Sequence, residues 1–193
     1  MDATELDAAY TDLLSEAEAI GDTTPLSADA QSAVDWTLAH LALSDRMLAT
    51  AARGILSGLS VTIDNRDTLE NTAIASLVAS TTHAQRVDVV RRNAADLTTV
   101  IKAIPDHAAA TPVQLHLVGR DGRPVPDQEL PWDDLIRLRA SEHLPGHTAR
   151  LKALASSAQP SPRPNSRAAA ADPEAGAHDE GHPPPGLHSR PRT

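Results

Sequence analysis

The sequence contains no cysteine and no phenylalanine, and aromatic residues make up only 2% of its 193 residues. Without cysteine, the chain forms neither a disulfide framework nor a thiolate metal site, and any nucleophilic thiol must come from another molecule. Because hydrophobic residues still amount to 40%, the core must be built from Leu, Ala, Val and Ile. This set of residues favours packed helices over a sheet, which would be richer in aromatic residues and Thr.

Long hydrophobic runs and a basic surface charge are also missing. No stretch approaches the roughly 20 apolar residues that cross a bilayer, and the N-terminus lacks a basic-then-apolar signal pattern. We therefore expect no membrane partner and a cytoplasmic location. The formal net charge is −9, whereas a nucleic-acid-binding protein needs a basic face. We expect no nucleic-acid partner, and solubility is the simplest reason for the charge.

The composition changes sharply after Leu154 and predicts a division at residue 155. Residues 156–193 hold eight of the 15 prolines and almost no large apolar side chain. Such a segment buries too little apolar surface to offset the entropy of ordering it, so we predict a disordered C-terminal tail. Residues 1–155 are predicted to form one helical domain.

Apolar residues recur at three- and four-residue steps through residues 1–155, which predicts amphipathic helices. In the first helix the stripe consists of Leu6, Tyr10, Leu13, Ala17 and Ile20. The fold class is therefore predicted to be all-α, as a four-helix bundle. The expected helices are 4–20, 27–56 with Ser27 as its cap, 67–104 with Asp67 and Glu70 as a capping box, and 131–154.

A short stretch between the third and fourth predicted helices breaks the helical pattern. Val113–Val118 reads as a strand, and the Gly119–Gly122 stretch that follows it reads as a turn. We expect a small hairpin in which this strand pairs with Arg123–Val125.

Three histidines fall on apolar stripes that should face the core. His40 lies on the second predicted helix, and His143 and His147 lie on the fourth. Residues at i and i+4 share one helix face with Cβ atoms about 5–6 Å apart, which suits chelation of one ion. A third imidazole from a neighbouring helix would complete a facial set of ligands and leave positions for water or substrate. The sequence thus predicts a divalent-metal site on His40, His143 and His147.

Two observations keep another interpretation open. Nine histidines in a chain of this length give about 0.4 such pairs by chance, so the motif has a real false-positive rate. His178 and His182 show the same spacing in the predicted tail. The alternative is that the three residues are ordinary core or boundary histidines.

The segment between His143 and His147 argues against a regular helix. Pro145 and Gly146 lie between them, and in a helix interior these residues cost about 3 and about 1 kcal/mol. A kink or break at this point would turn His147 away from the face that it shares with His143.

Two segments resemble a known family. The run from Trp36 through His40 to Leu48 is similar to a signature of the DinB-like superfamily, and closest to its mycothiol-dependent maleylpyruvate isomerase branch. The run from Leu135 to Leu151, with His143 and His147, resembles the family's last bundle helix. The resemblance covers about residues 4–155. The Pro145-Gly146 pair and the lack of a C-terminal domain found in some members are departures from it.

The resemblance implies a four-helix bundle with a long crossover and a divalent metal, zinc or sometimes nickel, on His40, His143 and His147. It also implies a low-molecular-weight thiol such as mycothiol as cofactor. A metal holding such a thiol would deprotonate it for S-transfer or for cis–trans isomerisation. The implied partners are a small-molecule thiol and an electrophilic substrate, and a homodimer stays open. The alternatives are a metal-dependent hydrolase, in which bound water attacks, and a non-enzymatic helical binding or regulatory module.

Overall fold

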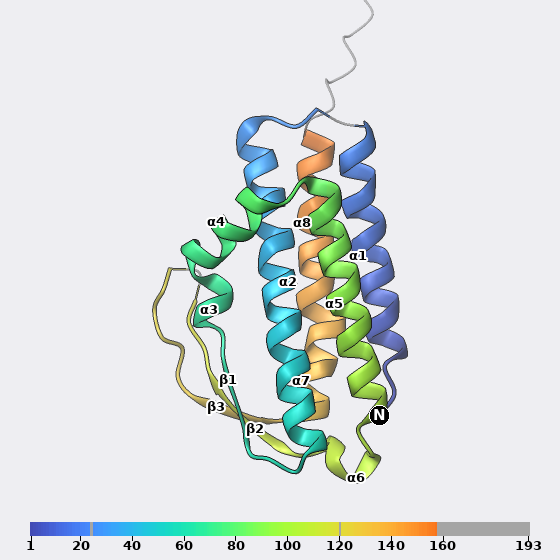
Figure 1. Ribbon diagram of the computed structural model, residues 1–193, viewed down its shortest axis with the longest axis vertical. Coiled ribbons are helices and arrows are strands. Elements are labelled where there is room, and N and C mark those ends of the chain that lie inside the picture. Colours follow the sequence, from blue (N-terminus) through green and yellow to red (C-terminus); the bar gives the residue numbers. More distant parts are fainter. Residues whose placement is uncertain (24, 120, 158–193) are drawn as a thin grey trace, which may run out of the picture. The chain divides into compact units, whose positions relative to one another are not determined.

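The computed structural model describes residues 1–23, 25–119 and 121–157, and this part of the chain is mostly helical with a small sheet (Figure 1). The predicted tail lies outside the described residues except for residues 156–157, which extend the last helix. The long helices lie side by side: α2 packs on α5, and α1 packs on both α5 and α8. Their bounds are α1 Thr4–Thr23, α2 Ala28–Leu56, α5 His83–Ala103, α7 Trp132–Leu138 and α8 Leu144–Ser157.

The apolar stripes predicted from the sequence form the core. All five stripe residues of α1 are at most 4% exposed, and Val34, Leu38 and Leu41 of α2 are fully buried. Burying one such Leu or Val side chain stabilises the fold by about 1.5–3 kcal/mol. The predicted cap of α2 is also confirmed, because the Ser27 hydroxyl accepts from the backbone N–H of Ala30 at 3.2 Å.

The single helix predicted for residues 67–104 is wrong. The segment divides into α3 (Arg66–Leu69), α4 (Asn71–Ser80) and α5, and the expected capping box at Asp67 does not form. A different capping box, between Thr82 and Gln85, starts α5. The buried guanidinium of Arg86 donates to the carbonyl oxygens of Val78, at 3.0 Å, and Thr81. It thereby donates to carbonyl groups at the end of α4, where regular helical hydrogen bonding stops.

The mostly helical fold and a strand at the predicted place, Val113–Val118, are confirmed, but a three-stranded sheet takes the place of the expected hairpin. The strands are β1 (Val61–Asp64), β2 (Pro112–His116) and β3 (Gln128–Pro131), in the order β1-β2-β3. β1 runs parallel to β2, with Val61 opposite Val113, and β3 is antiparallel to β2. The predicted strand Arg123–Val125 does not form; its place holds one isolated antiparallel bridge, between Val118 and Pro124. The short helix α6 (Asp106–Ala109) precedes β2.

One face of this sheet is apolar. Val61 and Ile63 of β1 and Val113 and Leu115 of β2 are buried, and they alternate with exposed or half-buried residues. This alternation is expected for a sheet with one face on the core. The sheet therefore closes one side of the space next to α2.

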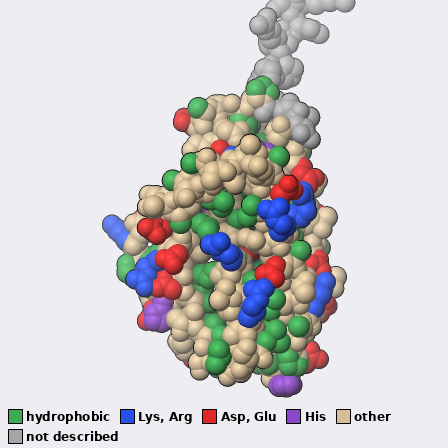
Figure 2. Space-filling model, in the orientation of Figure 1, with side chains coloured by type: hydrophobic (Ala, Val, Ile, Leu, Met, Phe, Trp, Pro, Cys, Tyr) green, Lys and Arg blue, Asp and Glu red, His purple; other side chains and the backbone are tan. Residues whose placement is uncertain are grey.

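The molecular surface carries mixed charge. On the face drawn in Figure 2, basic and acidic side chains lie next to one another between apolar side chains. Among the described residues, no helix combines the length and the apolar character needed to cross a bilayer.

Candidate metal centre

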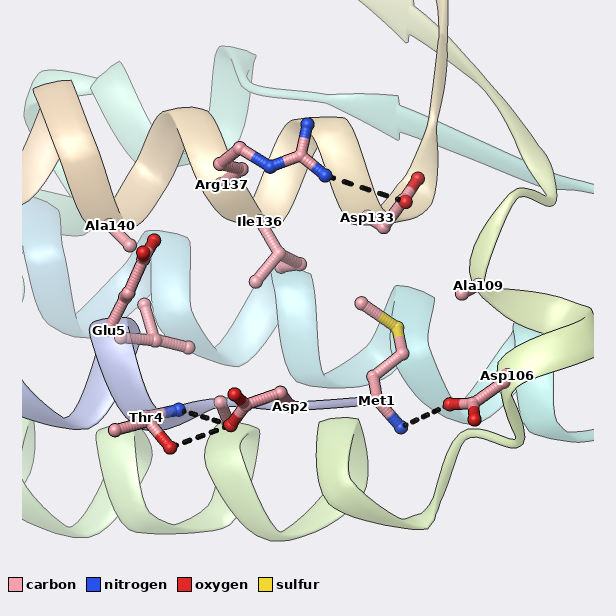
Figure 3. Close-up of a pocket in the computed structure, with 12 residues that line it drawn as sticks. Met1, Asp2, Thr4, Glu5, Asp106, Ala109, Asp133, Ile136, Arg137 and Ala140 are labelled. Carbon is pink, nitrogen blue, oxygen red and sulfur yellow. Dashed lines mark hydrogen bonds and ion pairs between the residues drawn. The ribbon is translucent and has the colours of Figure 1, made fainter.

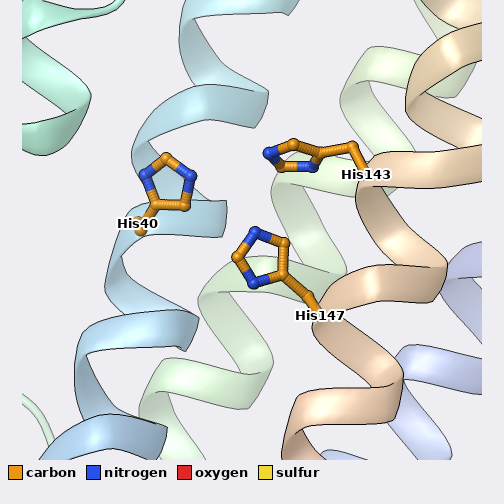
Figure 4. A group of neighbouring side chains, drawn as sticks. All are labelled: His40, His143 and His147. Atoms are coloured by element: carbon orange, nitrogen blue, oxygen red, sulfur yellow. The ribbon is translucent and has the colours of Figure 1, made fainter. Parts of the chain in front are cut away.

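The structure brings His40, His143 and His147 together from two helices (Figure 4). The ring centroids of His40 lie 5.8 Å from His143 and 5.5 Å from His147, and those of His143 and His147 are 4.7 Å apart. One ring nitrogen from each residue can be chosen so that all three atoms lie within 4.8 Å of one another. His40 and His147 are buried, and His143 is half-buried.

These separations suit a metal site whose ligand nitrogens move closer together when the ion binds. Zn–N bonds of about 2.0–2.1 Å place two tetrahedral ligands roughly 3.4 Å apart. Small rotations of the imidazoles about their side-chain bonds would bring the nitrogens to that spacing. Three nitrogen donors without a carboxylate suit zinc, nickel or copper better than magnesium or calcium, which prefer oxygen.

Pro145 does not turn His147 away from the cluster. Between α7 and α8 the chain forms one π-helical turn, Arg139–His143, in which the backbone N–H of Leu144 donates to the carbonyl oxygen of Arg139. Pro145 has no N–H to donate, and its ring needs room beside the carbonyl of residue 141 in a regular helix. The wider turn lies where that room is needed, and the helix continues with both His143 and His147 facing His40.

A backbone contact orients the ring of His40. Its Nδ1 lies 3.0 Å from the carbonyl oxygen of Thr68 in α3. A carbonyl only accepts, so Nδ1 carries the proton and Nε2 has the lone pair that a metal requires. Trp36, one turn earlier on α2, stacks on the other side of this ring with centroids 5.0 Å apart and planes within 16°. The ring is thus held in one tautomer and one orientation.

A buried charge network lies directly behind His143. The Arg139 guanidinium donates to the Asp45 carboxylate, to the Tyr10 hydroxyl at 3.1 Å and to the Ser44 hydroxyl at 3.3 Å. Tyr10 also donates to Asp45. The Nη1 atom of Arg139 lies 3.3 Å from Nδ1 of His143. The network therefore connects α1, α2 and the π turn beside the histidines.

The contact between Arg139 and His143 bears on metal binding. A guanidinium only donates, so in this contact Nδ1 of His143 accepts and Nε2 of the neutral ring carries the proton. Binding an ion through Nε2 would move that proton to Nδ1 and end the contact with Arg139. The Asp45 carboxylate offsets the positive charge that the guanidinium would otherwise place beside a cation.

Burial dominates the ionisation of this network. Burial raises the pKa of Tyr10, so its hydroxyl stays protonated and donates. Burial also raises the pKa of Asp45, while Arg139 acts in the opposite direction. Although burial alone would lower it, the pKa of Arg139 is raised because Asp45 stabilises the charged form. Oδ2 of Asp45 is buried without a hydrogen-bond partner among the described residues.

Sequence reasoning found the three histidines but missed their neighbours. Tyr10 was assigned to the core stripe, and Asp45, Arg139 and Thr68 were not singled out. One signal was present: Arg139 lies four residues before His143, on the inward face of the helix. A cation on such a face needs a buried partner. Which residue that partner would be depends on helix packing.

A pocket of about 450 Å³ opens beside the histidines. Its walls come from α2, β1, β2, α7 and the π turn, and His40 and His143 are among its lining residues. A second pocket, of about 320 Å³, is lined by the start of α1 together with residues of α6, α7 and the π turn, and contains no histidine (Figure 3). It holds two ion pairs, Arg137 with Asp133 and the N-terminal ammonium of Met1 with Asp106. The pocket lined by His40 and His143 is therefore the one that gives access to the histidines.

Comparisons with known proteins add no relative: no protein-family model, no curated protein and no solved structure matches the chain. The resemblance to the DinB-like superfamily rests on the quoted motifs and stays a prediction.

Proposed function

We propose that the chain is a metal-binding, DinB-like four-helix bundle that binds one divalent ion, zinc in the first place, on His40, His143 and His147. The observation that carries this proposal is the convergence of three imidazoles from two helices to within 4.8 Å, beside a pocket. Such an arrangement is unfavourable for ordinary core histidines whenever two of them are protonated, because like charges then lie close together. Metal binding gives the cluster a physical reason.

The residues present fit such an ion. Three neutral imidazoles leave the charge of the cation uncompensated, and a thiol or water that reaches it has a strongly lowered pKa. His40 presents Nε2 because Thr68 accepts from Nδ1. Trp36 stacks on that ring and limits its rotation. The half-buried His143 lines the pocket, so a small molecule entering there approaches the histidines directly.

The reaction we propose is transfer of an external small thiol to an electrophile, or thiol-dependent isomerisation, as the family resemblance implies. The absence of cysteine means that the sulfur nucleophile must come from a second molecule. The pocket lies beside the histidines, so a small thiol or a substrate would reach them from it.

The test uses cobalt as a spectroscopic substitute for zinc and N-acetylcysteine as the thiol. The cobalt-loaded protein should develop a sulfur-to-cobalt charge-transfer absorption when the thiol is added, and the His143→Ala variant should not. The His107→Ala variant is the matched control, because His107 is exposed and lies outside the cluster. A metal-loaded protein without any thiol-dependent absorption would refute the thiol chemistry. A folded protein that takes up no metal would favour a non-enzymatic helical module.

A further inference from the structure

The pocket beside the histidines has a mainly apolar wall. Seven apolar and seven polar side chains line it, but most of the surface that they expose to the pocket is apolar. Leu138 is 41% exposed at this site, and its neighbour Leu135 is half-buried. The apolar side chains are Met47 and Leu48 of α2, Ile63 of β1, Leu115 of β2, Leu117, and Leu135 and Leu138 of α7.

Most polar groups in this wall are already paired within the protein. The Asn65 side chain donates to the carbonyl oxygen of Val118 at 3.0 Å and accepts from its N–H at 2.7 Å. The Thr68 hydroxyl donates to the carbonyl oxygen of Asn65 at 2.8 Å, and the Ser44 hydroxyl donates to that of Leu41 at 3.1 Å. A ligand would have to break these bonds to accept from the Thr68 or Ser44 hydroxyl, which costs more than it returns.

The charges of the wall disfavour an anionic ligand. Among the described residues that line the pocket, Arg139 is the only Lys or Arg, and Asp45 already compensates its charge. Glu142 is exposed at the same pocket and adds a negative charge. A carboxylate or phosphate lying against this wall, away from the histidines, would find no uncompensated arginine or lysine and would meet this acid.

We infer that this pocket binds a substrate with an uncharged, largely apolar body, whose reactive polar end lies at His40 and His143 and whose hydrocarbon part lies against β1, β2 and α7. The inference deepens the proposed function, on which the reactive role of the histidine end rests. A volume of about 450 Å³ accommodates a medium-sized organic molecule. The apolar side chains at the mouth are explained by a ligand that covers them.

The preference can be measured on the full-length protein without a metal. N-phenyl-1-naphthylamine, an uncharged apolar fluorophore, should bind and be displaced by n-alkanols, with affinity rising roughly fourfold for each added methylene. Alkanoates of the same length should displace it at least about tenfold more weakly, because a buried unpaired carboxylate is costly. Leu117→Ser should reduce alkanol affinity several-fold. Leu59→Ser should leave it unchanged, since Leu59 is 61% exposed and does not line this pocket.

Any one of three results would overturn the inference. The fluorophore does not bind, alkanoates displace it as strongly as alkanols do, or the Leu117→Ser variant keeps its alkanol affinity. Zinc uptake measured on separate portions of the same preparations distinguishes this outcome from that of the proposed function. A protein that takes up zinc but shows no preference for apolar ligands refutes only the substrate class. A protein that shows the preference without binding zinc refutes only the metal site.

Discussion

Nδ1 of His40 lies 3.0 Å from the backbone carbonyl oxygen of Thr68, and this contact joins the histidine cluster to the α3 segment. Because the carbonyl accepts, the ring has two separate tasks: Nδ1 donates to the Thr68 carbonyl, and Nε2 carries the lone pair through which a metal would bind. The two tasks can be separated by substitution.

His40→Asn should keep the first task and lose the second. The asparagine amide can place a donor near the position of Nδ1, whereas nothing replaces Nε2. We expect the metal-free variant to retain its free energy of unfolding to within about 1 kcal/mol, while His40→Ala loses about 1–3 kcal/mol because the Thr68 carbonyl is left without its donor. Urea unfolding of the metal-stripped proteins measures both values. Zinc retained by either variant would exclude His40 as a ligand.

The buried pair of Asp45 and Arg139 should be sensitive to the loss of one partner. Asp45→Asn leaves the guanidinium buried without its counter-charge, which costs about 3–5 kcal/mol. The double variant Asp45→Asn, Arg139→Gln replaces both charges by amides and should recover a large part of that loss. Urea unfolding of the two variants checks this. A double variant less stable than Asp45→Asn would mean that the charge pair is not the source of the effect.

Gly146 offers a stabilising substitution within the candidate site. It lies in α8, its φ is not positive, and a Cβ atom built there meets no other atom within 4 Å. Gly146→Ala should therefore stabilise the protein by about 0.5–1 kcal/mol through reduced freedom of the unfolded chain. Thermal unfolding measures the gain. Zinc affinity should be unchanged, and a marked decrease would indicate that the segment must flex for the site to close.

The Asp64 carboxyl should stabilise the fold, and this contribution should be lost in acid. Hydrogen bonds from Arg66 lower the pKa of this carboxyl to about 2. A carboxyl whose pKa is lower in the folded state stabilises the protein at pH values above its pKa in the unfolded state, about 4. This stabilisation is lost as the pH falls through its pKa in the folded state, about 2. The contribution should be small, at most about 1 kcal/mol, because the pair is exposed to solvent. The difference in unfolding free energy between wild type and Asp64→Asn should shrink between pH 4 and pH 2. A constant difference would contradict this assignment.

The sequence predicted the elements whose signal is local. The stripe of α1 and the Ser27 cap of α2 are encoded by residues a few positions apart, and both were predicted correctly. The division of residues 66–103 was missed because apolar residues keep a helical step across it, and its cause includes Arg86 contacts that exist only after packing. The Thr82 and Gln85 capping box was a readable local signal that went unused.

The sheet and the surroundings of the histidines depend on contacts between distant residues. β1 is four residues long, and its partner β2 follows only after α3 to α6, so no local pattern shows the parallel pairing. Helix stripes placed the three histidines inward, and so predicted their approach. Pro145 suggested a break, whereas the π turn that accommodates it depends on how the whole helix packs. The Asp45 and Arg139 pair also arises only when α2 and the π turn meet.

The central claim is that the three histidines bind one ion. It is tested most directly by a zinc titration of the metal-stripped, full-length protein, monitored by isothermal titration calorimetry. We expect about one ion per chain for the wild type and for His107→Ala, and loss of at least about 100-fold in affinity for His40→Ala, His143→Ala and His147→Ala, since each removes one of three ligands. A correctly folded wild type that takes up no zinc, nickel or cobalt would contradict the account. So would zinc binding that survives substitution of all three histidines.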